Sequence, residues 1–105
     1  MKNRVVITGM GVVAPNALGL TEFEQALRIG KSGIRYIKRL EELKFSCRIG
    51  GIPESSMDDG NDAHAGNIGY AVTAALEAWR NAGLTVPGPD DPADWDAGAI
   101  VGCGI

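Results

Sequence analysis

The chain has few of the residues that most often bind metals or form disulfides. Its 105 residues include two cysteines, Cys47 and Cys103, and a single histidine, His64. Two cysteines do not make a disulfide framework, and both lie in expected strands, which predicts small buried side chains in a reducing compartment such as the cytoplasm. The acidic loop residues lack the spacing of a calcium loop, so we expect no bound metal at Asp58, Asp59, Asp62, Asp90, Asp91, Asp94 or Asp96.

The sequence also lacks a long apolar run and an excess of positive charge. No segment approaches the roughly 20 apolar residues that cross a bilayer, and the net charge is −3. Neither nucleic acid nor a membrane is therefore an expected partner. The basic residues are bunched mid-chain with acidic residues among them, which predicts a solvated face at Lys31, Arg35, Lys38, Arg39, Lys44 and Arg48.

We expect no secretory leader either. Lys2 and Arg4 precede a mostly apolar stretch, as they would in a leader. That stretch contains two glycines, ends at Pro15-Asn16 and has no Ala-x-Ala cleavage site near it. We therefore expect the chain to stay in the cytoplasm.

The most informative stretch is residues 4–15, Arg-Val-Val-Ile-Thr-Gly-Met-Gly-Val-Val-Ala-Pro. Its β-branched residues fit a buried strand, and Gly9 and Gly11 permit backbone angles or close approaches that a Cβ would forbid. The pattern predicts a central strand that runs into a tight loop. A helix should then begin at Thr21, which has capping-box spacing to Glu24, and end at Gly30.

The rest of the chain continues the alternation of strands and helices. Residues 45–52 predict a second strand, and the polar residues 53–66 a loop. Apolar residues at helical spacing then predict a helix ended by Gly83, with Trp79 in the core: Ile68, Val72, Ala75, Leu76 and Trp79. After a polar loop at 85–94, the run 97–101 predicts a final strand. The order strand, helix, strand, helix, strand predicts an α/β layer architecture.

The final strand bears on domain organisation. A chain of 105 residues has room for one core. The Ala-Gly-Ala-Ile-Val run at 97–101 is apolar on both faces, as in a strand buried between helix layers. A chain that stops at Ile105 leaves the edge of that strand uncovered. We expect residues 1–105 to be the first piece of a larger protein.

The glycine-rich turns suggest two kinds of chemistry, dinucleotide binding and nucleophilic catalysis. Residues 9–14 match the dinucleotide pattern G-x-G-x-x-G/A, but Pro15 disfavours the helix that should open there and face the pyrophosphate. Cys103 sits in a glycine-flanked turn like a nucleophile, yet His64 is the one available histidine base and lies in a polar loop. The residues thus favour a structural Cys103, a solvent-exposed His64 and no bound cofactor.

Four ordered stretches resemble one family, the β-ketoacyl-acyl-carrier-protein synthases. Residues 4–15 are similar to the start of these enzymes, and Gly-Lys-Ser-Gly-Ile-Arg at 30–35 resembles the turn after their first helix. Ala-Ala-Leu-Glu-Ala-Trp at 74–79 with Asn-Ala-Gly-Leu at 81–84 resembles their third helix. Gly-Ala-Ile-Val-Gly-Cys-Gly-Ile at 98–105 resembles a strand that ends in Gly-Ser-Gly-Ile.

The resemblance implies the N-terminal part of a thiolase-like fold, layered α/β/α/β/α in the full-length homodimer. It implies decarboxylative Claisen condensation of an acyl thioester with malonyl-acyl carrier protein, in fatty acid or polyketide biosynthesis. The family's cysteine nucleophile, two histidines and lysine all lie downstream of position 105, so residues 1–105 contain no catalytic residue and should be inactive alone. Cys103 occupies the serine position of Gly-Ser-Gly-Ile, and Ile105 matches an isoleucine that gates the acyl pocket.

The chain departs from the family pattern at residues 62–69. The family has a Met-Asp-Arg-Phe-like stretch with several basic residues there, whereas this region is acidic and glycine-rich. The departure leaves open a non-catalytic, chain-length-factor-like subunit that pairs with a related synthase. A dinucleotide-binding Rossmann domain is the remaining alternative.

Overall fold

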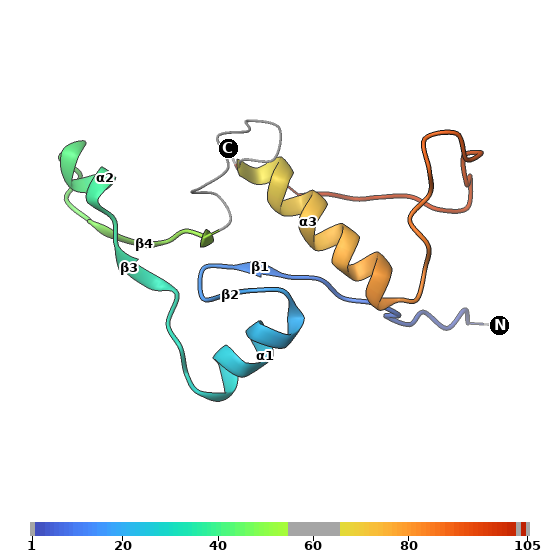
Figure 1. Ribbon diagram of the computed structural model, residues 1–105, viewed down its shortest axis with the longest axis horizontal. Helices are drawn as coiled ribbons and strands as arrows, with labels where there is room; N and C mark the ends of the chain where they lie inside the picture. The colour runs from blue at the N-terminus through green and yellow to red at the C-terminus, as the bar shows by residue number, and fades with distance from the viewer. Residues whose placement is uncertain (1, 55–65, 103, 105) are drawn as a thin grey trace.

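The computed structural model describes residues 2–54, 66–102 and 104 (Figure 1). The described residues form seven elements: β1 (Val13–Ala14), β2 (Ala17–Leu18), α1 (Leu20–Arg28), β3 (Ile34–Tyr36), α2 (Lys38–Glu42), β4 (Ile49–Gly51) and α3 (Gly66–Asn81). Strand β1 pairs antiparallel with β2, and β3 pairs antiparallel with β4. The expected mixture of helices and strands is present in these residues, in two short ladders rather than one layered sheet.

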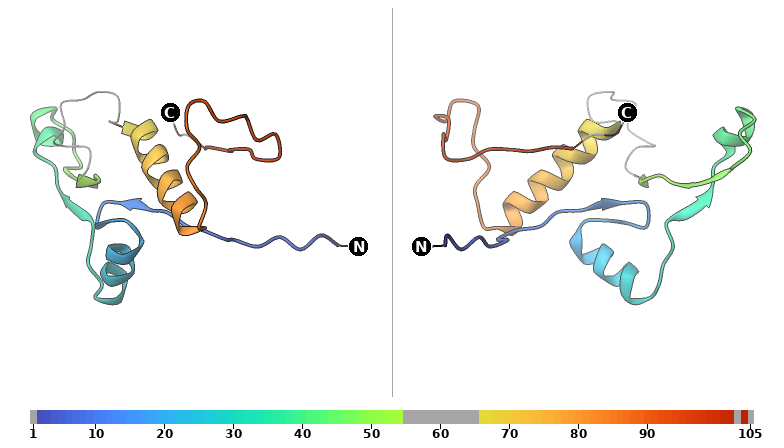
Figure 2. Two further views of the ribbon diagram at one scale, coloured as in Figure 1. Left: turned by 45° about the vertical axis from the view of Figure 1, so that its right-hand side comes forward. Right: turned by 180° about the vertical axis from the view of Figure 1, so that it is seen from behind.

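The molecule is long and open, with extents of 54 × 34 × 25 Å. Its accessible surface is 9222 Å², whereas a compact monomer of this mass exposes about 5,600 Å². Among the described residues, Ala26 is the one buried apolar side chain, and Val5 and Ile7 are 92% and 85% exposed. The elements therefore form without a closed core around them (Figure 2).

Two predicted strands differ from the structure. Of the strand expected in residues 4–14, β1 alone has a ladder partner, and residues 4–12 are irregular. Residues 97–101 are irregular too, and Ile100 is fully exposed. A strand needs the N–H and C=O groups of a neighbour, so apolar sequence alone does not make one.

The start of α1 also differs from the prediction. The helix begins at Leu20, with Gly19 at the N-cap position (φ 85°) and no side-chain cap, so the Thr21–Glu24 capping box does not form. Glu24 pairs with Arg28 one turn later, at 2.6 Å. A carboxylate from α3 accepts the Leu20 N–H instead, at 2.7 Å. A distant acceptor therefore replaces the local cap.

Both predicted glycine helix ends are confirmed. Gly30 and Gly83 have φ of 67° and 75°. The next N–H groups bond back to Ala26 and Trp79, at 2.8 and 3.1 Å, which is the Schellman arrangement. Lack of a Cβ makes this left-handed exit accessible, and it fixes the direction in which the chain leaves each helix.

The second expected strand is shorter than predicted and has an unforeseen partner. Strand β4 covers Ile49–Gly51 of the predicted 45–52, and it pairs with β3, a strand that was not predicted. In the observed register Tyr36 faces Ile49. The Glu41 carboxylate accepts a hydrogen bond from the Tyr36 phenol. This hydrogen bond raises the pKa of Tyr36 above its ordinary value.

The glycines of the opening stretch cross helix α3 rather than make a turn. A Cβ on Gly9 would meet the backbone of Ala78 and Ala82, with Ala82 N at 2.7 Å. A Cβ on Gly11 would meet the backbone of Ala74 and Ala78, with Ala78 N at 2.8 Å. The predicted tight loop is therefore wrong, and the alternative use of these glycines, a close approach, is the one observed.

Polar side chains of α3 take the place of a neighbouring strand. The Asn81 side-chain oxygen accepts the Met10 N–H at 3.0 Å. The Glu77 carboxylate accepts the Val12 N–H at 2.8 Å through one oxygen and the Leu20 N–H at 2.7 Å through the other. Because residues 77 and 81 lie one turn apart, alternate N–H groups of the extended chain meet successive turns of the helix.

Substitution of Gly11 tests the close approach. We expect Gly11→Ala to lower the free energy of unfolding by about 1–3 kcal/mol, since its Cβ would displace the backbone of α3. Gly98→Ala is the matched control, because nothing lies within 4 Å of a Cβ built there. Urea unfolding followed by far-UV circular dichroism measures both, and equal stabilities for the two variants would contradict the assignment.

Substitution of Glu77 tests the two-oxygen acceptor. Glu77→Gln leaves one oxygen and turns an NH₂ group toward the other N–H. We therefore expect the free energy of unfolding to fall by about 1–3 kcal/mol. Amide hydrogen exchange should become faster at Val12 or Leu20. The control Glu24→Gln removes an exposed i,i+4 ion pair and should cost about 0.3–0.5 kcal/mol. Unchanged exchange at both amides in Glu77→Gln would show that the carboxylate is dispensable.

Candidate functional site

An apolar groove of about 900 Å³ lies along α3 in the described part of the chain. Its walls come from three parts of the chain: residues 11–13, the first half of α3, and residues 100–102 with Gly104. The walls therefore bring segments from near the two ends of the sequence together beside one helix (Figure 1).

Helix α3 builds the floor of this groove because its apolar positions repeat at helical spacing. The helix is confirmed as predicted, and Ile68, Val72 and Ala75 line the groove. Ile68 is 75% exposed, so the face predicted as core is open. Trp79 lies outside the groove, half-buried, and donates its indole N–H to the Thr85 carbonyl at 2.8 Å.

A second, smaller cavity of about 350 Å³ has both polar and apolar walls. It lies between the β1–β2 turn and residues 31–35, and both signs of charge line it: Glu22, Lys31, Arg35 and Glu54. Arg35 reaches Glu54 at 3.7 Å and donates to the Ile52 carbonyl at 3.0 Å. Two cations matched by two carboxylates do not favour a charged ligand of either sign.

The site residues singled out in the sequence fall mainly outside the described residues. Ile105, Cys103, His64 and the first aspartate cluster all do, as does most of the predicted loop 53–66. The gating role of Ile105 stays a prediction, although its neighbour Gly104 lines the apolar groove. Cys47, expected to be buried, is exposed.

The described part of the chain shows neither a metal-ion cluster nor a membrane-spanning helix. There, no group of three or more histidine, cysteine or acidic side chains is placed to hold a metal ion. The same residues include no helix that is both long enough and apolar enough to span a bilayer.

The geometry argues against a phosphate at Gly9 and Gly11. A dinucleotide needs free N–H groups after the glycines and at the start of the next helix. Here the Glu77 carboxylate occupies both positions, on the N–H of Val12 and the N–H of Leu20. The protein's own anion fills the place that a pyrophosphate would need.

Glu77 and Asn81 are the residues that the sequence analysis missed. Helical periodicity placed both on the α3 segment without giving either a role. The signal that could have found them is an acceptor pair one turn apart beside the small residues Ala74 and Ala78. Such a face suits a backbone that approaches closely and still needs hydrogen-bond acceptors.

Comparison with known proteins gives a consistent result. The model of the family "Beta-ketoacyl synthase, N-terminal domain" matches residues 2–105. A 3-oxoacyl-[acyl-carrier-protein] synthase 2 of Coxiella burnetii is 31% identical over 114 residues, which cover 99% of this chain and 26% of the relative. A putative polyketide beta-ketoacyl synthase 1 of Streptomyces halstedii is 31% identical over all of this chain and 26% of its own length.

A third relative matches over a shorter stretch. The tetracenomycin polyketide synthase ketoacyl synthase beta subunit of Streptomyces glaucescens is 47% identical over 47 residues, 45% of this chain and 12% of its own. No solved structure matches. The chain spans about a quarter of the length of the first two relatives. With the family model matched from residue 2 to residue 105, the chain belongs to the beta-ketoacyl synthase family.

Proposed function

We propose that this chain is the N-terminal segment of a 3-oxoacyl-[acyl-carrier-protein] synthase, inactive alone, whose remainder lies downstream. The complete enzyme carries out decarboxylative condensation in fatty acid or polyketide biosynthesis, in the cytoplasm. The whole-chain similarity to a 3-oxoacyl-[acyl-carrier-protein] synthase and to a polyketide ketoacyl synthase supports this proposal.

The reaction follows from the family chemistry. A cysteine thiolate accepts the acyl group from a thioester and releases the carrier thiol. The malonyl thioester then loses CO₂, and the resulting carbanion attacks the acyl-cysteine carbonyl, so that a carbon–carbon bond forms and the thiolate leaves. Backbone N–H groups stabilise the oxyanion formed in each attack. The nucleophile, two histidines and a lysine belong to the part of the protein beyond residue 105.

The exposed apolar side chains of two segments predicted as buried strands are the observation that carries this proposal. Val5, Ile7 and Ile100 belong to these segments and are exposed in the described structure. A layered α/β/α/β/α fold would bury these side chains against further strands and helices. Burial of each large apolar side chain contributes about 1.5–3 kcal/mol, so further synthase structure would stabilise this segment strongly.

The expected partners are acyl carrier protein, acyl and malonyl thioesters, and a second copy of the synthase in a homodimer. A chain-length-factor-like subunit, paired with a related synthase, is the second candidate. The 47% identity over 47 residues to a ketoacyl synthase beta subunit supports this second candidate. The downstream sequence separates the two, because such a factor lacks the cysteine nucleophile.

A chimera tests the proposal. This chain replaces the matching first quarter of the Coxiella burnetii relative, and condensation is measured with acyl and malonyl thioesters of acyl carrier protein. We expect activity in the chimera and none in residues 1–105 alone, because the catalytic residues lie in the other three quarters. The same chimera without its cysteine nucleophile is the control. Condensation or malonyl decarboxylation by the isolated chain would overturn the proposal.

The chimera also tests Ile105. In the proposed role this side chain lines the acyl pocket, so Ile105→Trp should reduce condensation of long acyl chains at least about tenfold and spare short ones. Ile29→Trp, at an exposed position, is the control. An equal effect on every chain length would argue that Ile105 does not line the pocket.

A further inference from the structure

Four residues form a hydrogen-bonded cluster between the opening stretch, the start of α1 and helix α3. The Glu77 carboxylate accepts the Val12 N–H at 2.8 Å and the Leu20 N–H at 2.7 Å. The Gly19 N–H donates to the Val12 carbonyl at 3.1 Å. Both the N–H and the C=O of Val12 are therefore bonded, and we call Val12, Gly19, Leu20 and Glu77 the Glu77 cluster.

Two glycines give this cluster its close geometry. Gly19 has a φ of 85°, which favours glycine, and a Cβ built there would lie 3.1 Å from Oε1 of Glu77. Gly11 precedes Val12 and lies against the backbone of α3, where a Cβ would meet Ala78 N at 2.8 Å. A side chain at either glycine would displace the carboxylate or Val12.

The backbone that the cluster holds is a wall of the apolar groove. Val12 and Val13 line this groove together with Gly102 and Gly104. Glu77 is not one of the lining residues, so it acts on the groove through the backbone of Val12. The position of this wall is therefore fixed from behind, by a side chain outside the groove.

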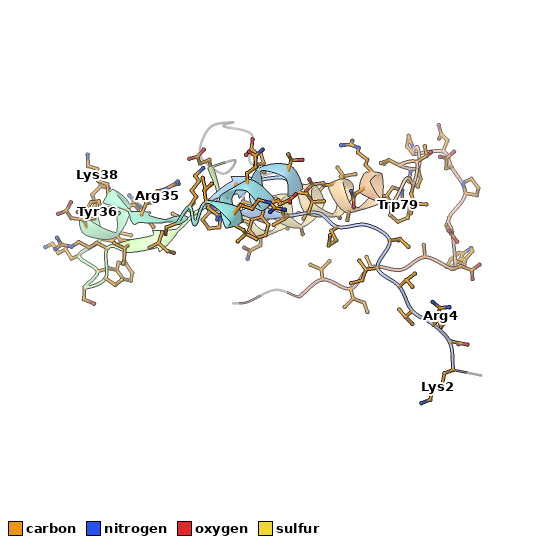
Figure 3. The ribbon with its side chains drawn as sticks, turned by 90° about the horizontal axis from the view of Figure 1, so that it is seen from below. Lys2, Arg4, Arg35, Tyr36, Lys38 and Trp79 are labelled. Carbon is orange, nitrogen blue, oxygen red and sulfur yellow. The ribbon has the colours of Figure 1, made fainter. Side chains whose placement is uncertain are left out.

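A second acceptor on α3 holds a residue that is not part of the wall. Asn81 accepts the Met10 N–H at 3.0 Å, and Met10 is exposed and outside the groove lining. Figure 3 shows Trp79, between these two acceptors in the sequence, toward the opposite end of the molecule from Lys38. Asn81 and Glu77 thus make the same kind of hydrogen bond to the same extended chain, and the one from Glu77 holds the wall.

We propose that Glu77 is a positioning residue for acyl-chain selection in the complete synthase. Gly104 lines the same groove as Val12, and Ile105, the next residue, is the one proposed to line the acyl pocket. A shift of residues 12–13 would change the space beside that pocket. A wall held in one place discriminates between acyl lengths, whereas a wall that moves adapts to them. This inference rests on the proposed function and deepens it.

The chimera with the Coxiella burnetii relative tests this role of Glu77. We measure kcat/KM for condensation of short, medium and long acyl chains and take the ratio of the preferred length to the others. This ratio does not depend on how much enzyme is folded, so a merely structural loss leaves it unchanged. Glu77→Gln removes the acceptor of one N–H group and should lower the ratio at least about threefold.

Two further variants make the test specific. Gly19→Ala disturbs the same cluster from the side of α1 and should lower the ratio in the same direction. Asn81→Ala is the matched control, because it removes the acceptor of an N–H outside the groove, and it should leave the ratio unchanged.

The outcomes separate this inference from the proposed function. An unchanged ratio in Glu77→Gln and Gly19→Ala, or an equal fall in Asn81→Ala, would overturn the inference alone. Loss of condensation at every acyl length in both cluster variants would also overturn it, because Glu77 would then serve folding and not selection. An unsubstituted chimera without activity would contradict the proposed function and this inference with it.

Discussion

The Glu77 carboxylate is the interaction on which the arrangement of this chain depends. Its two oxygens accept N–H groups from residues 65 and 57 positions earlier in the sequence. One belongs to the extended stretch after Gly11 and the other to the start of α1. Because the carboxylate is charged and partly buried, these hydrogen bonds are stronger than bonds between neutral groups. A single side chain of α3 thus holds two remote segments without a sheet between them.

That interaction requires small residues on both sides. Gly9 and Gly11 let the extended backbone approach Ala74 and Ala78 on the helix, and the short distance brings the main-chain N–H groups within reach of Glu77. The same glycine spacing also occurs in nucleotide-binding loops, where N–H groups face a phosphate. Here the acceptor is a carboxylate of the protein itself, so these glycines serve the packing of the extended chain against α3.

A feature could be predicted from the sequence when it depends on residues that lie close together along the chain. Helix α3 and its end at Gly83 depend on residues within a few positions, and both are confirmed. The strands at residues 4–12 and 97–101 depend on distant partners, and apolar composition alone did not determine their pairing. β3 was missed for the same reason, because its partner lies thirteen or more residues later. The role of Ile105 stays a prediction from family resemblance alone, since no local pattern marks a pocket residue.

The exposed apolar residues divide into two surfaces of different chemistry, and the difference bears on what each surface binds. The groove beside α3 is lined almost wholly by apolar and small residues, as is the interior between layers of a fold. Residues 34–51, which contain β3, α2 and β4, instead mix the exposed side chains of Tyr36, Phe45 and Ile49 with lysines and arginines. A surface without charge has no means of selecting a partner by electrostatics and suits permanent burial within one protein. A surface that mixes charged and apolar side chains would have to desolvate its charges on such burial, which costs free energy unless each charge is paired.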